Sequence, residues 1–379
     1  MNAARPHLVL IHPQFRPDGG AERAILNILT ALREDIRITV ISRGKWQADA
    51  GGIRFVECNP FSIGRFWKKW SFIRAAQRTL TTIEADIVQS QVRLPGCDIY
   101  RAGGGVHAQW LKQRKRILSR RKNFLMAWSP YHNYKLHLEK KMYSHPALKA
   151  VICNSGMVKQ ELLARYALDA GKVWVIHNAV DLTGYHPETV RLRRQEIRRR
   201  LGIADHETVY LFVGSGFERK GLDLLLRSFA GLPKDTHLII VGKDKHQSRY
   251  RKTAAAAGVD SRTHFMGMQT DVKPFYGAAD VFVLPTLYDA FANTVLEAMA
   301  CGLPVVTSSS CGAVDIIVDG ENGFIIDPFD KTRLTACLDQ LRIGRRREAI
   351  GAAGRTTVGK LSIDRMRENL LALYRRILE

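Results

Sequence analysis

Two consecutive series of apolar runs, each run followed by an amphipathic segment, constrain the fold of this chain more than any other feature. Continuous runs of Val, Ile and Leu are typical of strands buried on both faces of a parallel sheet. The runs are, in order, HLVLIH (7–12), IRITVIS (36–42), ADIVQSQ (85–91), LKAVICNS (148–155), TVYLFVGSG (208–216), HLIIVGKD (237–244), DVFVLPT (280–286) and GLPVVTSSS (302–310). The sequence therefore predicts an α/β fold.

The pattern restarts after a junction that carries proline and charge, at 172–187, and the chain of 379 residues is longer than one compact core usually covers. We therefore expect two Rossmann-like, doubly wound domains that face a cleft. The expected boundaries are 1–177 for an acceptor-binding domain and 178–358 for a nucleotide-sugar-binding domain. The apolar spacing of 359–379 predicts a final helix, which we expect to return to the first domain.

The charge of the chain indicates the chemistry of its partners. It has 58 Lys and Arg against 36 Asp and Glu, a net charge of +22, which attracts nucleic acid, anionic membranes or phosphorylated substrates. Six scattered cysteines without a C-x-x-C pair favour reduced thiols in a cytosolic protein. The first apolar run is too short for a signal peptide, and no run approaches a membrane span. We expect any membrane contact to be peripheral.

A glycine-rich turn with two cations follows the first strand of the second series. Gly214 opens the sequence GSGFERKG, in which Arg219 and Lys220 directly precede an expected helix. Free N–H groups at a helix start, reinforced by adjacent cations, bind anions. The segment predicts a pyrophosphate clamp, although an ordinary β-α turn with surface charges remains open.

A second candidate site spans 287–306. Asp289 lies in the loop after an expected strand, and Glu297 lies on the next helix. Both can face the crevice at the carboxyl ends of the strands. The helix that begins near Asn293, with Thr294 next, offers N–H groups to a phosphate. An acid near a helix start can also merely complement the helix dipole.

Motifs spread over the whole chain resemble the retaining glycosyltransferases of family 4, which have the GT-B fold. The spacing D-x7-E before AMACGLPVV is similar to the E-x7-E signature of that family. Within the family the chain looks most like the lipopolysaccharide-core glucosyltransferases. The other motifs are PDGGAER, NSGMVKQEL, HNAVDLTGYHP, RLPGCDIYRAGGGVHAQWL, VGSGFERKGLDLLLRSFAGLP and GLPVVTSSSCGAVDIIVDGENGF.

The resemblance implies roles for residues in the second domain. Glu297 matches the acid that holds the ribose hydroxyls of the nucleotide. Asp289 matches the acid that contacts the donor sugar, and it is one methylene shorter than the usual Glu. Arg219 and Lys220 match the cations that bind the diphosphate.

In the first domain, Gly19 and Gly20 match a loop whose backbone approaches the donor phosphates, where a Cβ would intrude. His107 follows three consecutive glycines and is expected to face the transferred sugar, although a structural histidine is the alternative. Relatives read GDGVH there, so Gly104 stands where they carry Asp.

The implied chemistry is transfer of an α-linked sugar with retention of configuration. Arg219, Lys220 and helix N-termini can stabilise the departing diphosphate without a metal or other cofactor, and the sequence has no D-x-D motif. No carboxylate suggests itself as a covalent nucleophile. Same-face attack assisted by the diphosphate is therefore favoured.

Basic and aromatic residues alternate in 109–128 and in RFWKKW (65–70). Taken as a helix, 109–128 places five apolar residues near one face, as in helices at anionic membrane interfaces. They are Trp110, Ile117, Leu118, Leu125 and Trp128. Packing of that stripe on its own domain is the alternative. The basic runs at 191–200 and 342–347 are expected to be solvated surface.

The preferred function is transfer of a hexose, with glucose first, from a UDP-sugar to a phosphorylated lipid A–core acceptor. The enzyme would be cytoplasmic and attached peripherally to the inner face of the bacterial inner membrane. An N-acetylglucosaminyltransferase acting on another envelope glycan is the alternative. A nucleic-acid-binding protein would explain the charge, but no reading module or stacking platform is evident, and no nucleic acid is expected. A nicotinamide oxidoreductase would need G-x-G-x-x-G after the first strand, which is absent.

Overall fold

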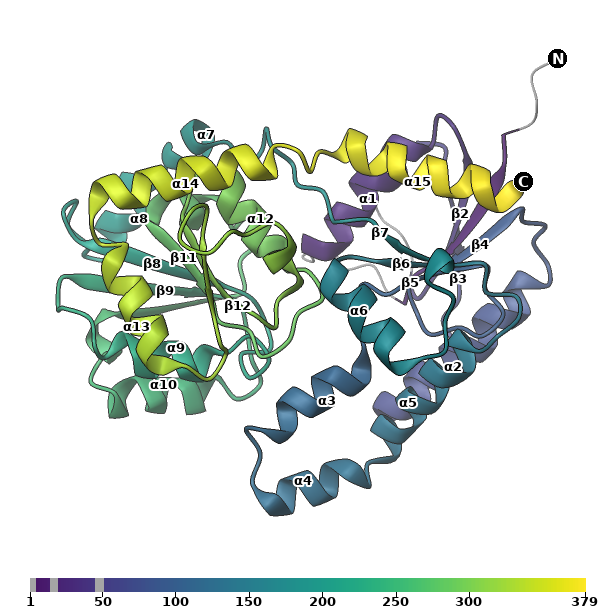
Figure 1. Cartoon of the computed structure of the whole chain (residues 1–379), viewed down its shortest axis with the longest axis horizontal. Helices are drawn as coiled ribbons and strands as arrows, with labels where there is room; N and C mark the ends of the chain where they lie inside the picture. The colour runs from purple at the N-terminus through teal and green to yellow at the C-terminus, as the bar shows by residue number, and fades with distance from the viewer. Residues whose placement is uncertain (1–4, 14–19, 45–50) are drawn as a thin grey trace. The chain divides into compact units, whose positions relative to one another are not determined.

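The computed structural model describes residues 5–13, 20–44 and 51–379 (Figure 1). The chain forms two compact units, each with its own sheet. Unit 1 contains residues 1–178 and 363–379, and unit 2 contains residues 179–362. The predicted α/β class with two doubly wound sheets is confirmed.

In unit 1 the described residues form a seven-stranded parallel sheet in the order β3-β2-β1-β4-β5-β6-β7. β1 lies in the middle and pairs in parallel with both β2 and β4. The chain order reverses between β1 and β4, which is the switch point of a doubly wound sheet. The strands are β1 (His7–Ile11), β2 (Arg37–Ser42), β3 (Arg54–Glu57), β4 (Ile87–Ser90), β5 (Ile99–Arg101), β6 (Ala150–Cys153) and β7 (Val173–Val175).

Helices cover both faces of this sheet (Figure 1). They are α1 (Gly20–Leu32), α2 (Gly64–Leu80), α3 (His107–Lys115), α4 (Arg120–Ala127), α5 (Pro130–Tyr143), α6 (Gly156–Arg165) and the short η1 (Ala170–Lys172), together with the final α15 (Ile363–Leu378). The expected return of the last helix is confirmed, because α15 packs on α1 and β4. Its Tyr374 hydroxyl donates to Gln89 Oε1 of β4 at 2.8 Å, and its Arg367 pairs with Asp35 at 2.6 Å.

Unit 2 has a six-stranded parallel sheet in the order β10-β9-β8-β11-β12-β13. Every residue of β8 is buried, and each fully buried Val, Leu or Phe side chain contributes ~1.5–3 kcal/mol of hydrophobic free energy. The switch point lies between β8 and β11. The strands are β8 (Thr208–Val213), β9 (Thr236–Val241), β10 (Thr263–Gly267), β11 (Val281–Leu284), β12 (Val305–Ser308) and β13 (Phe324–Ile326).

The helices of unit 2 also lie on both faces of its sheet (Figure 1). They are α7 (Pro187–Arg191), α8 (Arg194–Arg200), α9 (Leu222–Phe229), α10 (Gln247–Ala256), η2 (Asp260–Arg262), α11 (Lys273–Ala278), α12 (Asn293–Ala300), η3 (Gly312–Asp315), α13 (Lys331–Gln340) and α14 (Gly344–Val358).

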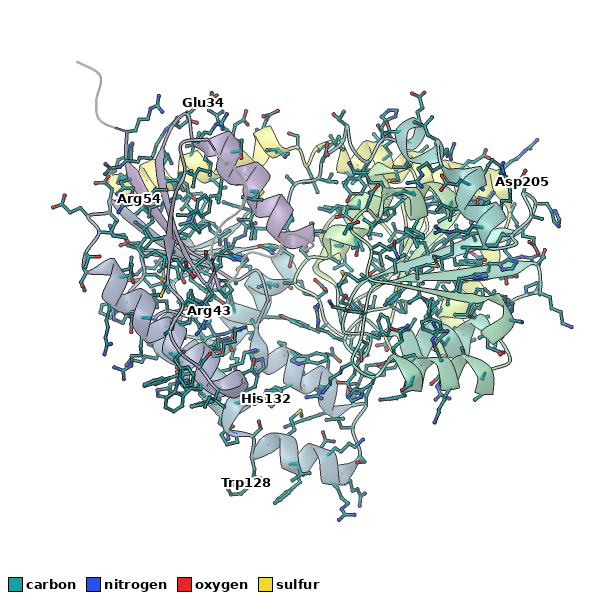
Figure 2. All side chains as sticks on the ribbon, turned by 180° about the vertical axis from the view of Figure 1, so that it is seen from behind. Glu34, Arg43, Arg54, Trp128, His132 and Asp205 are labelled. Carbon is teal, nitrogen blue, oxygen red and sulfur yellow. The ribbon has the colours of Figure 1, made fainter. Side chains whose placement is uncertain are left out.

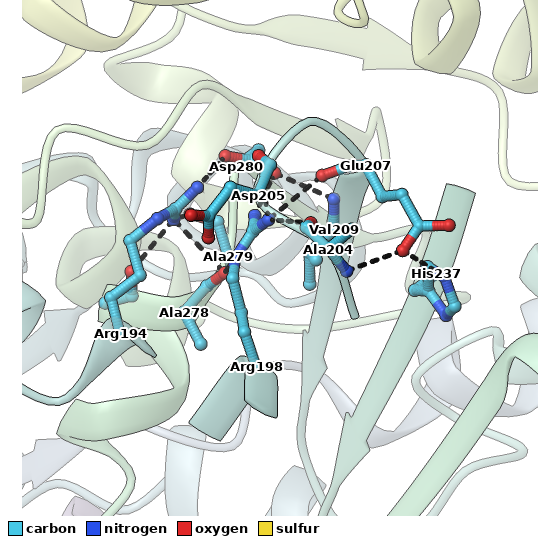
Figure 3. A network of polar contacts seen from close by, with 11 residues as sticks. Arg194, Arg198, Ala204, Asp205, Glu207, Val209, His237, Ala278, Ala279 and Asp280 are labelled. Carbon is cyan, nitrogen blue, oxygen red and sulfur yellow. Dashed lines mark hydrogen bonds and ion pairs between the residues drawn. The ribbon is translucent and has the colours of Figure 1, made fainter. Parts of the chain in front are cut away.

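The expectation that 191–200 is solvated surface is wrong for two arginines (Figure 3). Arg198 is fully buried, and its guanidinium bonds Asp280 at 2.6 Å and the carbonyls of Ala204, Asp205, Glu207 and Ala278. Arg194 also pairs with Asp280, at 2.8 Å. Charged groups are buried only where such partners replace water. These arginines therefore connect α8, by hydrogen bonds and ion pairs, to the residues beside β8 and β11.

All six cysteines are buried and free of disulfides. None of the helices that the structure describes is both long enough and apolar enough to cross a membrane.

Candidate functional site

The cationic turn of unit 2 begins where β8 ends. Gly214 follows the last residue of β8, and the turn leads to Gly221, the residue before α9. Gly221 has a φ of +77°, and a Cβ there would lie 1.8 Å from the carbonyl oxygen of Pro285. A Cβ on Gly214 would lie 3.3 Å from the Lys220 side chain. Glycine at position 221 lets the turn pack tightly on the loop after β11, and glycine at position 214 leaves room for the Lys220 side chain.

Both cations of this turn reach the same carboxylate. Asp289 Oδ2 accepts a hydrogen bond from Arg219 Nη1 at 2.9 Å and from Lys220 Nζ at 2.6 Å. Lys220 and Asp289 are each only 8% exposed, whereas the Arg219 side chain is 42% exposed. Burial would raise the pKa of Asp289, but the charges of Lys220 and Arg219 outweigh it and lower that pKa to about 2. The three residues form an ionised cluster with an excess positive charge.

Backbone contacts hold Asp289 in place. Its N–H donates to the Ser310 carbonyl at 3.0 Å, and its carbonyl accepts from the Gly312 N–H at 2.8 Å. Its Oδ1 accepts from the Phe291 N–H at 3.2 Å. The loops after β8, β11 and β12 thus meet around one carboxylate. This is the edge of the sheet where open α/β folds bind ligands, and it includes the switch point.

Helix α12 starts at Asn293, where the sequence places it, and Asn293 and Thr294 form its first turn. The Thr294 hydroxyl is buried and has no hydrogen-bond partner among the described residues. One turn further, Glu297 Oε2 accepts from the Tyr276 hydroxyl at 2.7 Å. Burial raises the pKa of Glu297, and hydrogen bonds from Tyr276 and Tyr185 oppose that rise. A hydroxyl without a partner in the first turn of α12 is therefore followed, one turn later, by a carboxylate that has one.

Unit 1 contains the other predicted site residues. Gly20 is the first residue of α1, and Gly19 lies outside the described residues. Of the three glycines before His107, Gly105 has a φ of +66° and the other two do not have positive φ. A Cβ on Gly104 would meet nothing within 4 Å. The chain therefore requires glycine at position 105, whereas position 104 has room for the Asp of the resembling proteins.

His107 is 4% exposed and is the first residue of α3. Its Nε2 lies 3.0 Å from Nδ1 of His132 on α5, and the two rings stack with centroids 5.2 Å apart. Burial, followed by the nearby Lys135, Arg93, His132 and Lys69, lowers the pKa of His107 to about 2. The imidazole is therefore neutral at physiological pH.

The interpretation of 109–128 as one helix with an apolar stripe is wrong. α3 ends at Lys115 and α4 begins at Arg120, so a break separates Trp110 from the later apolar residues. In the arm formed by α3, α4 and the start of α5, three apolar side chains point to solvent, with exposed fractions of 65% for Phe124, 69% for Leu125 and 72% for Trp128. Figure 2 labels Trp128 at the far end of the arm and His132 nearer the sheet. The apolar groups lie in α4 and at its end.

Sequence reasoning missed several residues that hold these groups. Tyr276, His132 and Glu139 are ordinary members of helical segments in the sequence, and no motif marks them. Arg93 opens the motif RLPGCDIYRAGGGVHAQWL, but the sequence assigned it no role. Their importance depends on contacts between elements distant in the chain. Among the described residues, no three His, Cys, Asp or Glu side chains cluster as a metal site would require.

Comparison with known proteins identifies the family. Residues 18–183 match the model described as "Glycosyltransferase Family 4", and residues 193–357 match the one described as "Glycosyl transferases group 1". Together they span most of both units. The chain belongs to glycosyltransferase family 4.

Two curated relatives match over most of their length. The lipopolysaccharide glucosyltransferase WaaG of Escherichia coli K12 is 25% identical over 331 residues, which is 86% of each chain. The lipopolysaccharide core biosynthesis glycosyltransferase LpsE of Rhizobium meliloti is 26% identical over 344 residues, which is 87% of each chain. As a family 4 member, this chain is a retaining glycosyltransferase that uses a nucleotide-sugar donor.

Solved structures agree on the fold. A crystal structure of WaaG superposes with a TM-score of 0.83 at 22% identity, covering 97% of this chain and 99% of that one. HepE of Anabaena, in complex with UDP and glucose, gives a TM-score of 0.73 at 18% identity, covering 98% and 100%. The fold is GT-B.

Proposed function

We propose that this family 4 enzyme transfers a hexose, with glucose as the first candidate, from a UDP-sugar to the inner core of lipopolysaccharide. The bond formed would be α-glycosidic. The curated names of WaaG and LpsE support this acceptor class, and the UDP bound in HepE supports the nucleotide. A transferase for N-acetylglucosamine acting on another envelope glycan is the alternative.

The cluster of Arg219, Lys220 and Asp289 carries the proposal. Its two cations and one carboxylate leave one positive charge in excess at the carboxyl end of β8. A nucleotide diphosphate gains negative charge when its bond to the sugar breaks. Fixed cations in a partly buried site stabilise that charge more in the transition state than in the bound substrate. Under this proposal Arg219 and Lys220 are catalytic, and Asp289 holds both side chains by hydrogen bonds and reaches the donor sugar.

The start of α12 would hold the rest of the nucleotide. Asn293 and Thr294 bring backbone N–H groups, which favour a phosphate, and the Thr294 hydroxyl lacks a partner among the described groups. Glu297 is held by Tyr276 and would accept the ribose hydroxyls. The backbone at Gly214 and Gly20 would approach the donor phosphates, and Gly19, proposed with them, lies outside the described residues.

His107 would contribute a neutral imidazole to the transferred sugar. Its low pKa excludes a protonated ring at pH 7. Its Nε2 is already hydrogen-bonded to His132, so Nδ1 remains to donate or accept one hydrogen bond with a sugar hydroxyl. The diphosphate itself would assist removal of the proton from the acceptor hydroxyl, with attack on the face that the leaving group vacates.

The arm of unit 1 would dock the enzyme on an anionic membrane, with its lipid-linked and phosphorylated acceptor. We define the arm as α3, α4 and the start of α5. The exposed Phe124, Leu125 and Trp128 follow the exposed cations Arg120 and Lys122. Apolar insertion beside positive charge is the chemistry of interfacial helices. The enzyme would then work at the inner face of the bacterial inner membrane.

Acceptor-dependent UDP release from a panel of UDP-sugars tests the proposed reaction. We expect UDP-glucose to be the best donor, and replacing Arg219 and Lys220 by Ala should lower kcat by at least about 100-fold. The control replaces the exposed pair Arg199 and Arg200 by Ala, which removes the same charge and should leave turnover within about twofold. Absence of UDP release with every donor, or near-normal turnover of the first double variant, would refute the proposal.

Vesicle flotation tests the membrane proposal separately. Changing Phe124, Leu125 and Trp128 to Ser should weaken binding to phosphatidylglycerol-containing vesicles by roughly tenfold or more, while wild-type protein should bind phosphatidylcholine vesicles poorly. The control triple variant changes exposed apolar residues of unit 2 to Ser, namely Leu192, Val318 and Ile343. Equal binding of the two triple variants would exclude the arm.

A further inference from the structure

A buried ion pair in unit 1 holds the turn that precedes His107. Glu139 of α5 is fully buried, and Arg93 in the loop after β4 is 8% exposed. Glu139 Oε1 accepts from Arg93 Nε at 2.9 Å and from Arg93 Nη2 at 2.7 Å, and its Oε2 accepts from the Tyr166 hydroxyl at 3.0 Å. The proposed reaction gives none of these three residues a role.

Both members of this ion pair form hydrogen bonds with the backbone of the turn. Arg93 Nη2 also donates to the carbonyl of Gly105 at 3.3 Å, and Glu139 Oε1 accepts from the backbone N–H of His107 at 3.1 Å. α3 begins at His107, and Val106 before it offers no capping side chain. A carboxylate at the first N–H of a helix does what a capping side chain does and complements the dipole. Glu139 therefore caps α3 from another helix.

The same helix also holds the His107 ring. His132, whose ring contacts that of His107, lies seven residues before Glu139, so both side chains come from one face of α5. Three basic groups lie near the ring, namely Arg93, Lys69 and Lys135, and Glu139 is the carboxylate that accompanies them. Burial and the charges of Arg93 and Lys69 lower the pKa of Lys135 to about 6. α5 thus fixes the backbone of His107 through Glu139 and its imidazole through His132.

An ion pair of this kind is poorly explained by stability alone. Removing two charges from water costs several kcal/mol per ion, and apolar side chains of similar volume often stabilise a core equally well. The pair instead fixes the orientation of the turn, because Arg93 and Glu139 bond each other and each also bonds the backbone of the turn with defined geometry.

We propose that Glu139 is a positioning residue for sugar transfer: with Arg93, it fixes the Gly103–His107 turn so that the His107 imidazole keeps one orientation. The inference rests on the proposed function, in which His107 contacts the transferred sugar. A misplacement of about 1 Å in such a group costs roughly 100-fold in rate. The nucleotide site of unit 2 contains neither Glu139 nor Arg93, so donor binding should not depend on them.

Kinetics of Glu139→Gln give the first test. Gln has the same size and keeps one acceptor oxygen, but it is neutral, so the charge-assisted bonds from Arg93 and the His107 N–H weaken and the second acceptor oxygen is lost. We expect kcat to fall by about 10–100-fold, while KM for the donor and Kd for UDP stay within about twofold. Glu139→Asp should recover part of the loss. The control is Glu34→Gln, an exposed glutamate of unit 1 (Figure 2), which should behave as wild type.

A second variant separates orientation from folding. Replacing Arg93 by Met together with Glu139 by Leu removes both charges and keeps an apolar core. We expect this double variant to stay folded, with a Tm near that of the wild type, and yet to be as slow as Glu139→Gln. Wild-type kcat in a folded Glu139→Gln or double variant would overturn the proposal.

Nuclear magnetic resonance of histidine labelled with ¹⁵N gives a test that needs no turnover. In Glu139→Gln we expect the His107 amide to exchange faster and the ring nitrogen signals of His107 and His132 to shift, with no change in Glu34→Gln. Unchanged ring signals and exchange in Glu139→Gln would overturn the positioning role. If wild-type enzyme uses no UDP-sugar, the proposed function fails, and these signals still decide whether Glu139 orients His107.

Discussion

Replacing Asp289 by Asn should destabilise unit 2 and strengthen its attraction for a diphosphate at the same time. The substitution keeps the shape of the side chain and removes the charge that neutralises Lys220, an ammonium group that is only 8% exposed. A buried cation that loses its carboxylate partner destabilises the folded state. The same loss raises the net charge of the cluster from +1 to +2, so its attraction for the phosphates of UDP increases.

The magnitude follows from the pKa of Asp289. The two cations lower it from 3.8 to about 2, which corresponds to about 2 kcal/mol of stability at neutral pH. For a unit of this size that is a decrease in Tm of ~4–8 °C. Because the folded-state pKa is depressed, this contribution is complete above the unfolded value near 4 and is lost as the pH falls through about 2. The difference between wild type and variant should therefore be constant from pH 7 to pH 5 and shrink below pH 4.

Scanning calorimetry across this pH range, with titration of UDP, checks both effects. The control is Asp339→Asn, whose pair with Arg342 is exposed, so that its Tm should change by no more than ~2 °C. We expect UDP to bind Asp289→Asn more tightly than wild type, although turnover falls. An Asp289→Asn variant as stable as Asp339→Asn, or a Tm difference that is undiminished at pH 2, would refute the charge argument. Weaker UDP binding would refute the place of the cations at the diphosphate.

Three further substitutions test other parts of the structure. Glu297→Ala should weaken UDP binding by roughly tenfold or more, since a hydrogen-bonded carboxylate is lost, and calorimetry showing unchanged affinity would reject the ribose assignment. Arg198→Met should lower the free energy of unfolding by about 3–5 kcal/mol. The exposed control Arg199→Met should lower it by less than about 0.5 kcal/mol. Urea unfolding, followed by hydrogen exchange in unit 2, measures both values. Gly105→Ala should cost about 1–3 kcal/mol because of its positive φ, whereas Gly104→Ala, with open space around it, should leave Tm unchanged; equal Tm values would contradict the turn geometry.

The sequence predicts the sheets well where strands are buried on both faces. Runs such as 208–213 and 281–284 are apolar without interruption, and they form β8 and β11 of unit 2. Short strands escaped prediction: β3 (Arg54–Glu57) is partly exposed, and β5 (Ile99–Arg101) and β13 (Phe324–Ile326) have three residues each. Such segments carry too few residues to show a period, and their pairing comes from neighbouring strands.

The candidate site could be predicted where one loop or helix start carries the signal. Gly214, Arg219 and Lys220 lie in a single turn, and the start of α12 at Asn293 agrees with the pattern. The ion pairs of Asp289 with both cations were not predictable, because they join residues about 70 positions apart. The prediction that 191–200 is solvated surface was wrong for the same reason, because Arg198 pairs with Asp280, which is distant in the sequence.

By itself, then, the sequence determined the alternation of strands and helices, the glycines of the tight turns, and the excess of positive charge. These properties depend on neighbours in the chain, on local backbone geometry or on simple sums. Only the tertiary structure decided which charges lose their water and which partner replaces it. Glu139 is one glutamate among many until α5 packs beside the turn before His107, where burial makes its few hydrogen bonds decisive.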